Sequence, residues 1–273
     1  MTVVLGGHET ATRHWDGGPG RALLVHCSLG HSGGWKGVAS VLSETHECRA
    51  FDLPGHGRSA EWDGKGVYQD TVCTQIREMI GDWTAPVDLV GHSFGATAAL
   101  RVAATTPALV RRLVLIEPVF FGAAYAVEPE FRDRNMRLNG FVDAMEAGDL
   151  GGAAKIFMES WGDGRPWEDL PEEQRATFTR QMRLIEAVQE TNNGDPERIL
   201  ADGKVAALPM PVLVITGGDS PEGSHKIAAA LESMIPDVRT VMIEGAGHMV
   251  PITHAAIVGP LVLDFLAEAA VRA

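Results

Sequence analysis

One serine in this sequence lies in a pattern that is typical of a catalytic nucleophile. Ser93 is the centre of Gly91-His-Ser-Phe-Gly95, which follows an apolar run over 87–90 and precedes a helical pattern over 94–105. A Gly-x-Ser-x-Gly turn between a strand and a helix strains the serine backbone and exposes the hydroxyl. Side chains at the two glycine positions would collide with the neighbouring strand or helix. We therefore predict that Ser93 is a nucleophile.

A serine hydroxyl needs a base that removes its proton, and we predict that His248 is this base. His248 lies in Gly245-Ala-Gly-His-Met249, a loop of small residues directly after the last predicted strand. This loop is expected at the same sheet edge as Ser93. His254, at the start of the final predicted helix, is the alternative among the ten histidines.

The base in turn needs a carboxylate that holds its tautomer and stabilises the imidazolium. Asp219 follows the predicted strand 211–216 in the turn Thr216-Gly-Gly-Asp-Ser-Pro221, at the same edge, and is the predicted acid. Asp is also common as a helix N-cap or turn residue. Glu117, at the end of the predicted strand 112–116, is the alternative acid.

Attack on a carbonyl forms an oxyanion, which must be stabilised by N–H donors already in place. One predicted donor is the amide of Phe94, the residue after the nucleophile. The other is expected in the loop His26-Cys-Ser-Leu-Gly30, where the amide of Ser28 is the predicted donor and that of Leu29 the alternative.

Strand and helix patterns alternate along much of the chain, which predicts an α/β fold with a mostly parallel central sheet flanked by helices. An amino-terminal hairpin over 3–5 and 9–15 would add antiparallel edge strands. The expected strands are 22–26, 48–52, 87–90, 112–116, 211–216 and 238–243, and the expected helices are 35–43, 68–83, 94–105, 224–235 and 254–270.

One interval breaks this alternation and predicts a helical cap over the carboxyl edge of the sheet. It contains helical patterns at 131–145, 152–161 and 171–191 and no strand pattern. We assign residues 1–118 and 209–273 to the core domain and 119–208 to the cap. The cap supplies apolar side chains that could pack internally or face a substrate: Phe120, Phe121, Tyr125, Met136, Phe141, Met145, Met158 and Trp161.

The net charge and the cysteine content of the sequence limit which partners and which cellular location we expect. The 23 Lys and Arg residues against 36 Asp and Glu give a net charge of −13, which would repel nucleic acid and anionic membranes. The odd number of cysteines and the absence of a secretory or membrane-spanning pattern predict a cytoplasmic protein. We expect the apolar side chains of the cap to select a small-molecule substrate. Outside Ser93, Asp219 and His248, no group of His, Cys and carboxylate residues has a spacing that is typical of metal ligands. We therefore predict no metal or cofactor. The oligomeric state is left open.

Together these motifs resemble the α/β-hydrolase family. His26 to Gly30 is similar to its His-Gly-x-x-Gly oxyanion loop, and Asp52-Leu-Pro-Gly-His-Gly-Arg-Ser59 to a structural turn of the family. The order serine, acid, histidine also fits the family. Two departures are present: Cys27 replaces the usual glycine, and the turn Gly217-Gly-Asp219 is one residue shorter than the family's Gly-x-x-Asp.

The resemblance implies a serine hydrolase that cleaves an ester-like bond of a small, largely apolar substrate, as a carboxylesterase or lactonase does. Ser93 argues against the haloalkane dehalogenases and epoxide hydrolases of the family, which have aspartate at this position. The alternatives are a carbon–carbon bond hydrolase, a cofactor-free perhydrolase or a hydroxynitrile lyase on the same scaffold, or a ligand sensor that retains the fold.

Overall fold

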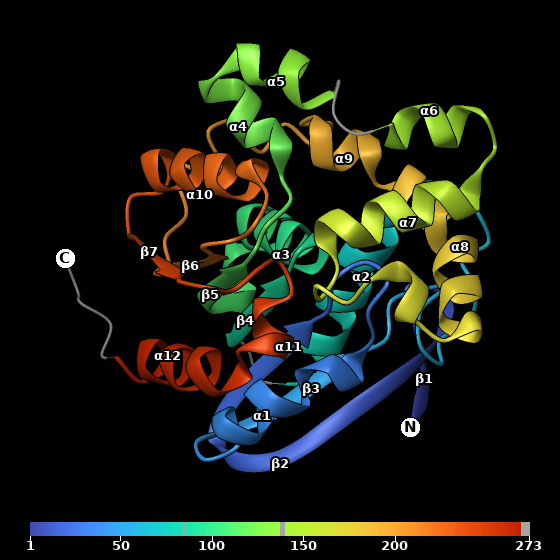
Figure 1. The fold of residues 1–273 in the computed structure, drawn as a ribbon. Helices are drawn as coiled ribbons and strands as arrows, with labels where there is room; N and C mark the ends of the chain where they lie inside the picture. Colours follow the sequence, from blue (N-terminus) through green and yellow to red (C-terminus); the bar gives the residue numbers. More distant parts are fainter. Residues whose placement is uncertain (84–85, 137–139, 269–273) are drawn as a thin grey trace.

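The computed structural model describes residues 1–83, 86–136 and 140–268, which form one seven-stranded sheet with helices on both faces (Figure 1). Its order is β1-β2-β4-β5-β6-β7, with β3 paired to β2. All pairings are parallel except that of β1 with β2. The strands are β1 (Thr2–Leu5), β2 (His8–Val25), β3 (His46–Phe51), β4 (Val87–His92), β5 (Val110–Ile116), β6 (Val212–Gly217) and β7 (Val238–Ile243). The predicted fold class is confirmed.

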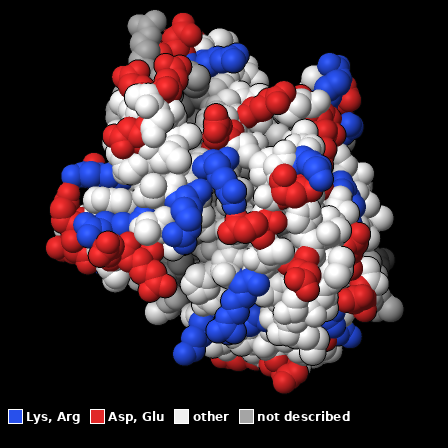
Figure 2. Space-filling view, turned by 90° about the vertical axis from the view of Figure 1, so that its right-hand side faces the viewer, with Lys and Arg blue, Asp and Glu red and all other residues white. Residues whose placement is uncertain are grey.

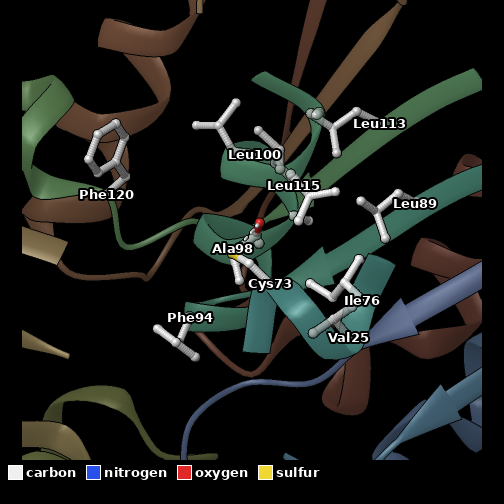
Figure 3. Close-up of a cluster of buried hydrophobic side chains, with 14 of the residues drawn as sticks. Val25, Cys73, Ile76, Leu89, Phe94, Ala98, Leu100, Leu113, Leu115 and Phe120 are labelled. Carbon is white, nitrogen blue, oxygen red and sulfur yellow. Dashed lines mark hydrogen bonds between the residues drawn. The ribbon is translucent and has the colours of Figure 1, made fainter. Parts of the chain in front are cut away.

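Alternate side chains of the central strands point to opposite faces of the sheet, so each face has its own apolar core. One face packs on α2 (Tyr68–Gly81), α3 (Phe94–Thr105) and α10 (Glu222–Met234). The other packs on α1 (Lys36–Leu42), α11 (Val250–Thr253) and α12 (Ala255–Ala267). Figure 3 shows the first core, in which side chains of the strands gather with those of α2 and α3: Val25, Leu89, Leu113, Leu115, Cys73, Ile76 and Leu100.

The first two strands differ from the prediction in extent. The hairpin is present, but β2 continues to Val25 and includes the expected strand at 22–26. Its pairing with β3 shifts register several times between Thr12 and Gly20. These irregularities bend the strand, because each extra residue in one strand of a pair increases the local twist. One continuous strand therefore pairs with β1 at its start and with the central sheet at its end.

A layer of helices lies between β5 and β6 in the chain and above one edge of the sheet in Figure 1. Its described residues contain no strand. The helices are α4 (Phe121–Val127), α5 (Pro129–Met136), α6 (Phe141–Glu146), α7 (Leu150–Trp161), α8 (Glu172–Ala187) and α9 (Gln189–Asn193). Side chains of α7 and α8 form a small core of their own, which includes Ala153, Ala154, Phe178, Met182 and Ile185. The cap boundaries at 119 and 208 remain our interpretation of this layer.

Helix boundaries in this layer differ from those expected. The helix expected at 131–145 is two helices, and α6 starts after Gly140, whose φ of 69° suits a glycine. Residues 137–139, within the expected helix, lie outside the described residues, as do residues 269–270 of the expected final helix. The described part of that final helix is α12, which begins at Ala255 and ends at Ala267, and a short helix α11 precedes it. In the described part of the chain, no helix is long and apolar enough to cross a membrane.

Candidate active site

Ser93 occupies a strained turn between β4 and α3, as its glycine pattern predicts. Its backbone has φ 56° and ψ −121°. A Cβ atom on Gly91 would lie 2.5 Å from Ala96 Cα, and one on Gly95 would lie 2.4 Å from the carbonyl oxygen of Val25. Both distances are far below a normal contact, so only glycine fits at these positions. The turn therefore fixes the serine at the amino terminus of α3, where the backbone N–H groups favour negative charge.

His248 contacts Ser93 directly. Its Nε2 lies 2.9 Å from Ser93 Oγ, and its Nδ1 lies 2.8 Å from Glu117 Oε2. An ionised carboxylate only accepts hydrogen bonds, so Nδ1 carries the proton and Nε2 can accept one from the serine hydroxyl. The imidazole is thus held in the tautomer that a general base for Ser93 requires. His248 is only 4% exposed.

Glu117 is a fully buried carboxylate with four hydrogen-bond donors around it. Besides His248, the amide of Gly217 (2.6 Å) and the hydroxyl of Ser220 (2.7 Å) donate to Oε1, and Ser224 Oγ (2.7 Å) donates to Oε2. Burial by itself would raise the pKa of Glu117, but the hydrogen bond and charge of His248 and these other donors lower the pKa below its ordinary value. The acid is therefore held in its ionised form.

The structure does not bring Asp219, the predicted acid, into contact with His248. Asp219 is exposed on the turn after β6, and its carboxylate forms no hydrogen bond or ion pair with any described residue. Its own amide donates to the carbonyl of Ala246 (2.9 Å). Because the flanking Gly217 and Ser220 both donate to Glu117, the short turn wraps around that carboxylate and carries Asp219 outward. The alternative acid is the one that contacts the histidine.

One sequence signal for Glu117 is present. It directly follows the apolar strand β5, whose last five residues are buried, and the neighbouring parallel strand β4 leads to Ser93 at the same edge. A charged residue at that point has to be satisfied within the protein. His254, the alternative base, is the N-cap residue of α12, and its Nδ1 is 2.9 Å from the hydroxyl of Thr253, the last residue of α11.

The two predicted oxyanion donors belong to segments that border the site. Phe94 is the first residue of α3, and Ser28 lines the same pocket as Ser93 and His248. Neither backbone amide has a hydrogen-bond acceptor among the described residues. The amide of Leu29, our alternative donor, instead donates to His56 Nε2 (3.0 Å). Cys27 is buried in the loop at 4% exposure, so the protein accommodates the side chain that replaces the usual glycine.

Two buried histidines connect this loop to the turn at 52–59. His26 Nδ1 donates to the carbonyl of Cys27 (2.7 Å), and His26 Nε2 accepts from the amide of Leu53 (2.9 Å). His56 is arranged in the same way: Nδ1 donates to the carbonyl of Pro54 (3.0 Å), and Nε2 accepts from Leu29. Each ring is neutral and joins the two segments, so the turn positions the oxyanion loop.

His92 contacts the loop that carries His248. Its Nε2 donates to the backbone carbonyl of His248 (2.9 Å), and the two rings lie 5.3 Å apart. Burial, together with the charge of a protonated His248, lowers the pKa of His92 to about 3. A neutral His92 therefore holds the loop that carries His248 without competing for its proton.

A pocket of about 400 Å³ opens beside these residues and is walled mainly by the helical layer. Trp161 of α7 meets the ring of His248 edge-on, with centroids 4.7 Å apart. Much of the lining is apolar and includes Phe121, Phe131, Phe141, Ile156, Phe157 and Val188. Of the described side chains in our list of apolar cap residues, Phe121, Phe141 and Trp161 line it; the side chain of Met136 lies outside the described part of the protein. The described residues contain no cluster of three or more His, Cys, Asp or Glu side chains that could hold a metal.

Comparison with known proteins decides the family. A model described as the alpha/beta hydrolase family matches residues 22–259. The chain belongs to the alpha/beta hydrolase family. The crystal structure of an alpha/beta hydrolase from Sphaerobacter thermophilus is similar to this hydrolase, with a TM-score of 0.72, 23% identity, and coverage of 98% of this chain and 100% of that one.

Two curated relatives match over most of this hydrolase. It is 30% identical over 260 residues to the polyketide synthase ThaQ of Burkholderia thailandensis, a match that covers 92% of this chain but only 12% of that protein. It is 23% identical over 256 residues to the (E)-2-((N-methylformamido)methylene)succinate hydrolase of Acinetobacter baylyi, with 92% of both chains covered. Further relatives are named as esterases, and this hydrolase is an enzyme of the same family.

The neutral rings of His26 and His56, which join the loop 26–30 to the turn 52–59, predict that this hydrolase loses stability in mild acid. Burial is the main cause that lowers the pKa of His26 to about 3 and that of His56 to about 4. Because the unfolded chain binds these protons near its ordinary pKa of about 6.5, the stabilisation is present above that pH and is lost as the pH falls toward 4. For each histidine, the free energy of unfolding falls by about 1.4 kcal/mol per pH unit as the pH is lowered through this range.

Urea unfolding at pH 7.0, 6.0 and 5.0 measures this loss. In His56→Gln, glutamine keeps one donor and one acceptor but does not titrate, so the free energy of unfolding should fall less steeply with pH than in the natural protein. Equal slopes for the two proteins would contradict the role of His56.

Proposed function

We propose that the chain is a serine hydrolase that cleaves an ester-like bond of a small, largely apolar substrate through a Ser93–His248–Glu117 triad. The observation that carries the proposal is the pair of hydrogen bonds of His248, one to Ser93 Oγ and one to Glu117. The pocket beside Ser93, with its largely apolar lining, supports a substrate of this kind. The esterases among the relatives support an ester as the bond that is cleaved.

In the proposed reaction His248 Nε2 takes the proton of Ser93 as Oγ attacks the carbonyl carbon of the ester. The carbonyl oxygen becomes an oxyanion that accepts hydrogen bonds from the amides of Ser28 and Phe94. Glu117 stabilises the imidazolium that forms. The tetrahedral intermediate collapses as His248 gives its proton to the leaving alcohol, which leaves an acyl group on Ser93. Water, deprotonated by His248, then releases the acid and restores the serine.

The remaining expectations are part of the same proposal. The substrate is a small molecule that is selected by the cap at 119–208, and Trp161 shields the imidazole from bulk water. On the face shown in Figure 2, Lys and Arg side chains are interspersed with Asp and Glu, which supports our expectation that nucleic acid is not a partner. We also propose a cytoplasmic location, based on the cysteine content of the sequence.

Replacement of the nucleophile tests the proposed function. Ser93→Ala should lower kcat for small 4-nitrophenyl esters by about 10⁴-fold or more while leaving the thermal unfolding of the protein nearly unchanged, because only the attacking oxygen is removed. A fluorophosphonate probe should label the natural protein at Ser93 and leave the variant unlabelled. Substantial ester turnover by Ser93→Ala would rule out the proposed mechanism, and labelling without turnover of any ester would favour a ligand sensor.

A matched pair of acid variants tests the identity of the triad carboxylate. Glu117→Gln should lower kcat by about 10²- to 10⁴-fold, because a neutral amide neither stabilises the imidazolium nor fixes the tautomer. Asp219→Asn removes the same charge from the neighbouring turn and should leave kcat within about twofold. Steady-state kinetics of both variants on one ester measure the difference. A larger loss in Asp219→Asn than in Glu117→Gln would restore Asp219 as the acid.

A further inference from the structure

One wall of the pocket is formed by side-chain amides. Asn135 of α5 and Gln189, Asn192 and Asn193 of α9 line it together. Tyr125 Oη accepts a hydrogen bond from Asn135 Nδ2 (2.7 Å) and donates one to Asn193 Oδ1 (3.2 Å). Asn193 Nδ2 in turn donates to Gln189 Oε1 (2.8 Å). Three of the four amides are therefore fixed by one connected network.

Asn192 is the exception in this amide wall. The residue is 8% exposed, yet its Oδ1 is buried without a hydrogen-bond partner, and its carboxamide forms no hydrogen bond to any described residue. Its backbone is satisfied, since the amide donates to the carbonyl of Val188 (2.9 Å) in α9. The unmet hydrogen-bonding capacity is thus confined to a side chain that lines the pocket.

An unpaired carboxamide is costly in a buried position, so buried polar groups are nearly always paired in folded proteins. An apolar side chain would pack at such a position without that cost. Since the other three amides are held in their network, Asn192 is the member of the wall that is available to a ligand. Rotation about its χ2 exchanges the oxygen and the nitrogen, so the carboxamide can pair with a group that donates, accepts or does both.

We propose that Asn192 is a specificity-determining residue that binds a neutral hydrogen-bonding group of the substrate, an amide or a hydroxyl. This inference rests on the proposed function, because it names the substrate class of the same site. A carboxylate fits the wall poorly: it only accepts hydrogen bonds, its charge would be buried among neutral amides, and the acidic Glu222 lines the same pocket. The substrate is therefore an ester with an apolar body and one neutral polar group.

Pairs of esters with the same shape test the inference. In the acyl pair, 4-nitrophenyl 5-acetamidopentanoate is compared with 4-nitrophenyl 7-methyloctanoate, in which CH₂–CH(CH₃) replaces NH–CO. In the alcohol pair, the hexanoate of 3-acetamidopropan-1-ol is compared with that of 5-methylhexan-1-ol. The two pairs distinguish which side of the ester bond reaches Asn192. Both kcat/KM with the active enzyme and Kd with Ser93→Ala, by calorimetry, are measured.

In at least one pair we expect a preference for the acetamido ester that Asn192→Leu lowers about tenfold, the size of one buried hydrogen bond. Turnover of the apolar ester should stay within about threefold, because leucine keeps the shape of the wall. Asn192→Ala serves as a second variant in case leucine disturbs folding. Gln181→Leu is a control for the loss of a buried amide outside the pocket: Gln181 is also 8% exposed with an unpaired Oε1, and its Nε2 donates to the carbonyl of Gly55 (2.9 Å). Because Gln181 does not line the pocket, the preference should be unchanged.

Turnover tests the proposed function, and the calorimetric Kd tests the role of Asn192, so the two proposals can fail separately. Absence of turnover for every ester would overturn the proposed function, and the calorimetric preference would still decide the role of Asn192. An equal preference in the natural protein and both Asn192 variants, or a loss of preference in Gln181→Leu of the same size, would overturn the inference.

Discussion

The imidazole of His248 is the point on which the arrangement of the whole sheet edge depends. It forms hydrogen bonds to groups that follow two adjacent parallel strands, Ser93 after β4 and Glu117 after β5, and its own loop follows β7. A buried carboxylate is tolerated at this edge only because the turn after β6 and the start of α10 supply three further donors. The segments after β4, β5 and β7 and the segment 217–224 are thereby linked through His248 and the carboxylate of Glu117.

Much of this arrangement follows from short-range patterns. Buried parallel strands must be apolar on both faces, so β4, β5 and β6, which contain apolar runs, could be placed within a few residues. The glycines around Ser93 are required by contacts of less than 3 Å, which is why their pattern is specific for the turn. Alpha/beta hydrolase membership and the contact of Ser93 with His248 agree with these patterns.

The rest depends on contacts that no local pattern contains. A turn sequence does not determine which way its aspartate points, and around Asp219 the direction is set by donors that bind Glu117 from β5. Part of the helical layer is harder to predict because α4, α5, α6 and α9 have eight residues or fewer, and α5 and α6 could be read as one helix. The hydrogen bonds of His26 and His56 join segments 27 residues apart, a separation at which neither ring identifies its partner.

The edge-on contact of Trp161 with His248 means that the helical layer contributes to the surroundings of the base as well as to the shape of the pocket. Recombination that exchanged this layer between relatives would carry both properties at once. A new substrate preference acquired in that way would be accompanied by a change in the surroundings of the His248 imidazole. Divergence by single substitutions in the wall of the pocket avoids that coupling, and α9, which bears amides and not the tryptophan, is a part of the layer where a substitution leaves the contact of Trp161 with His248 in place.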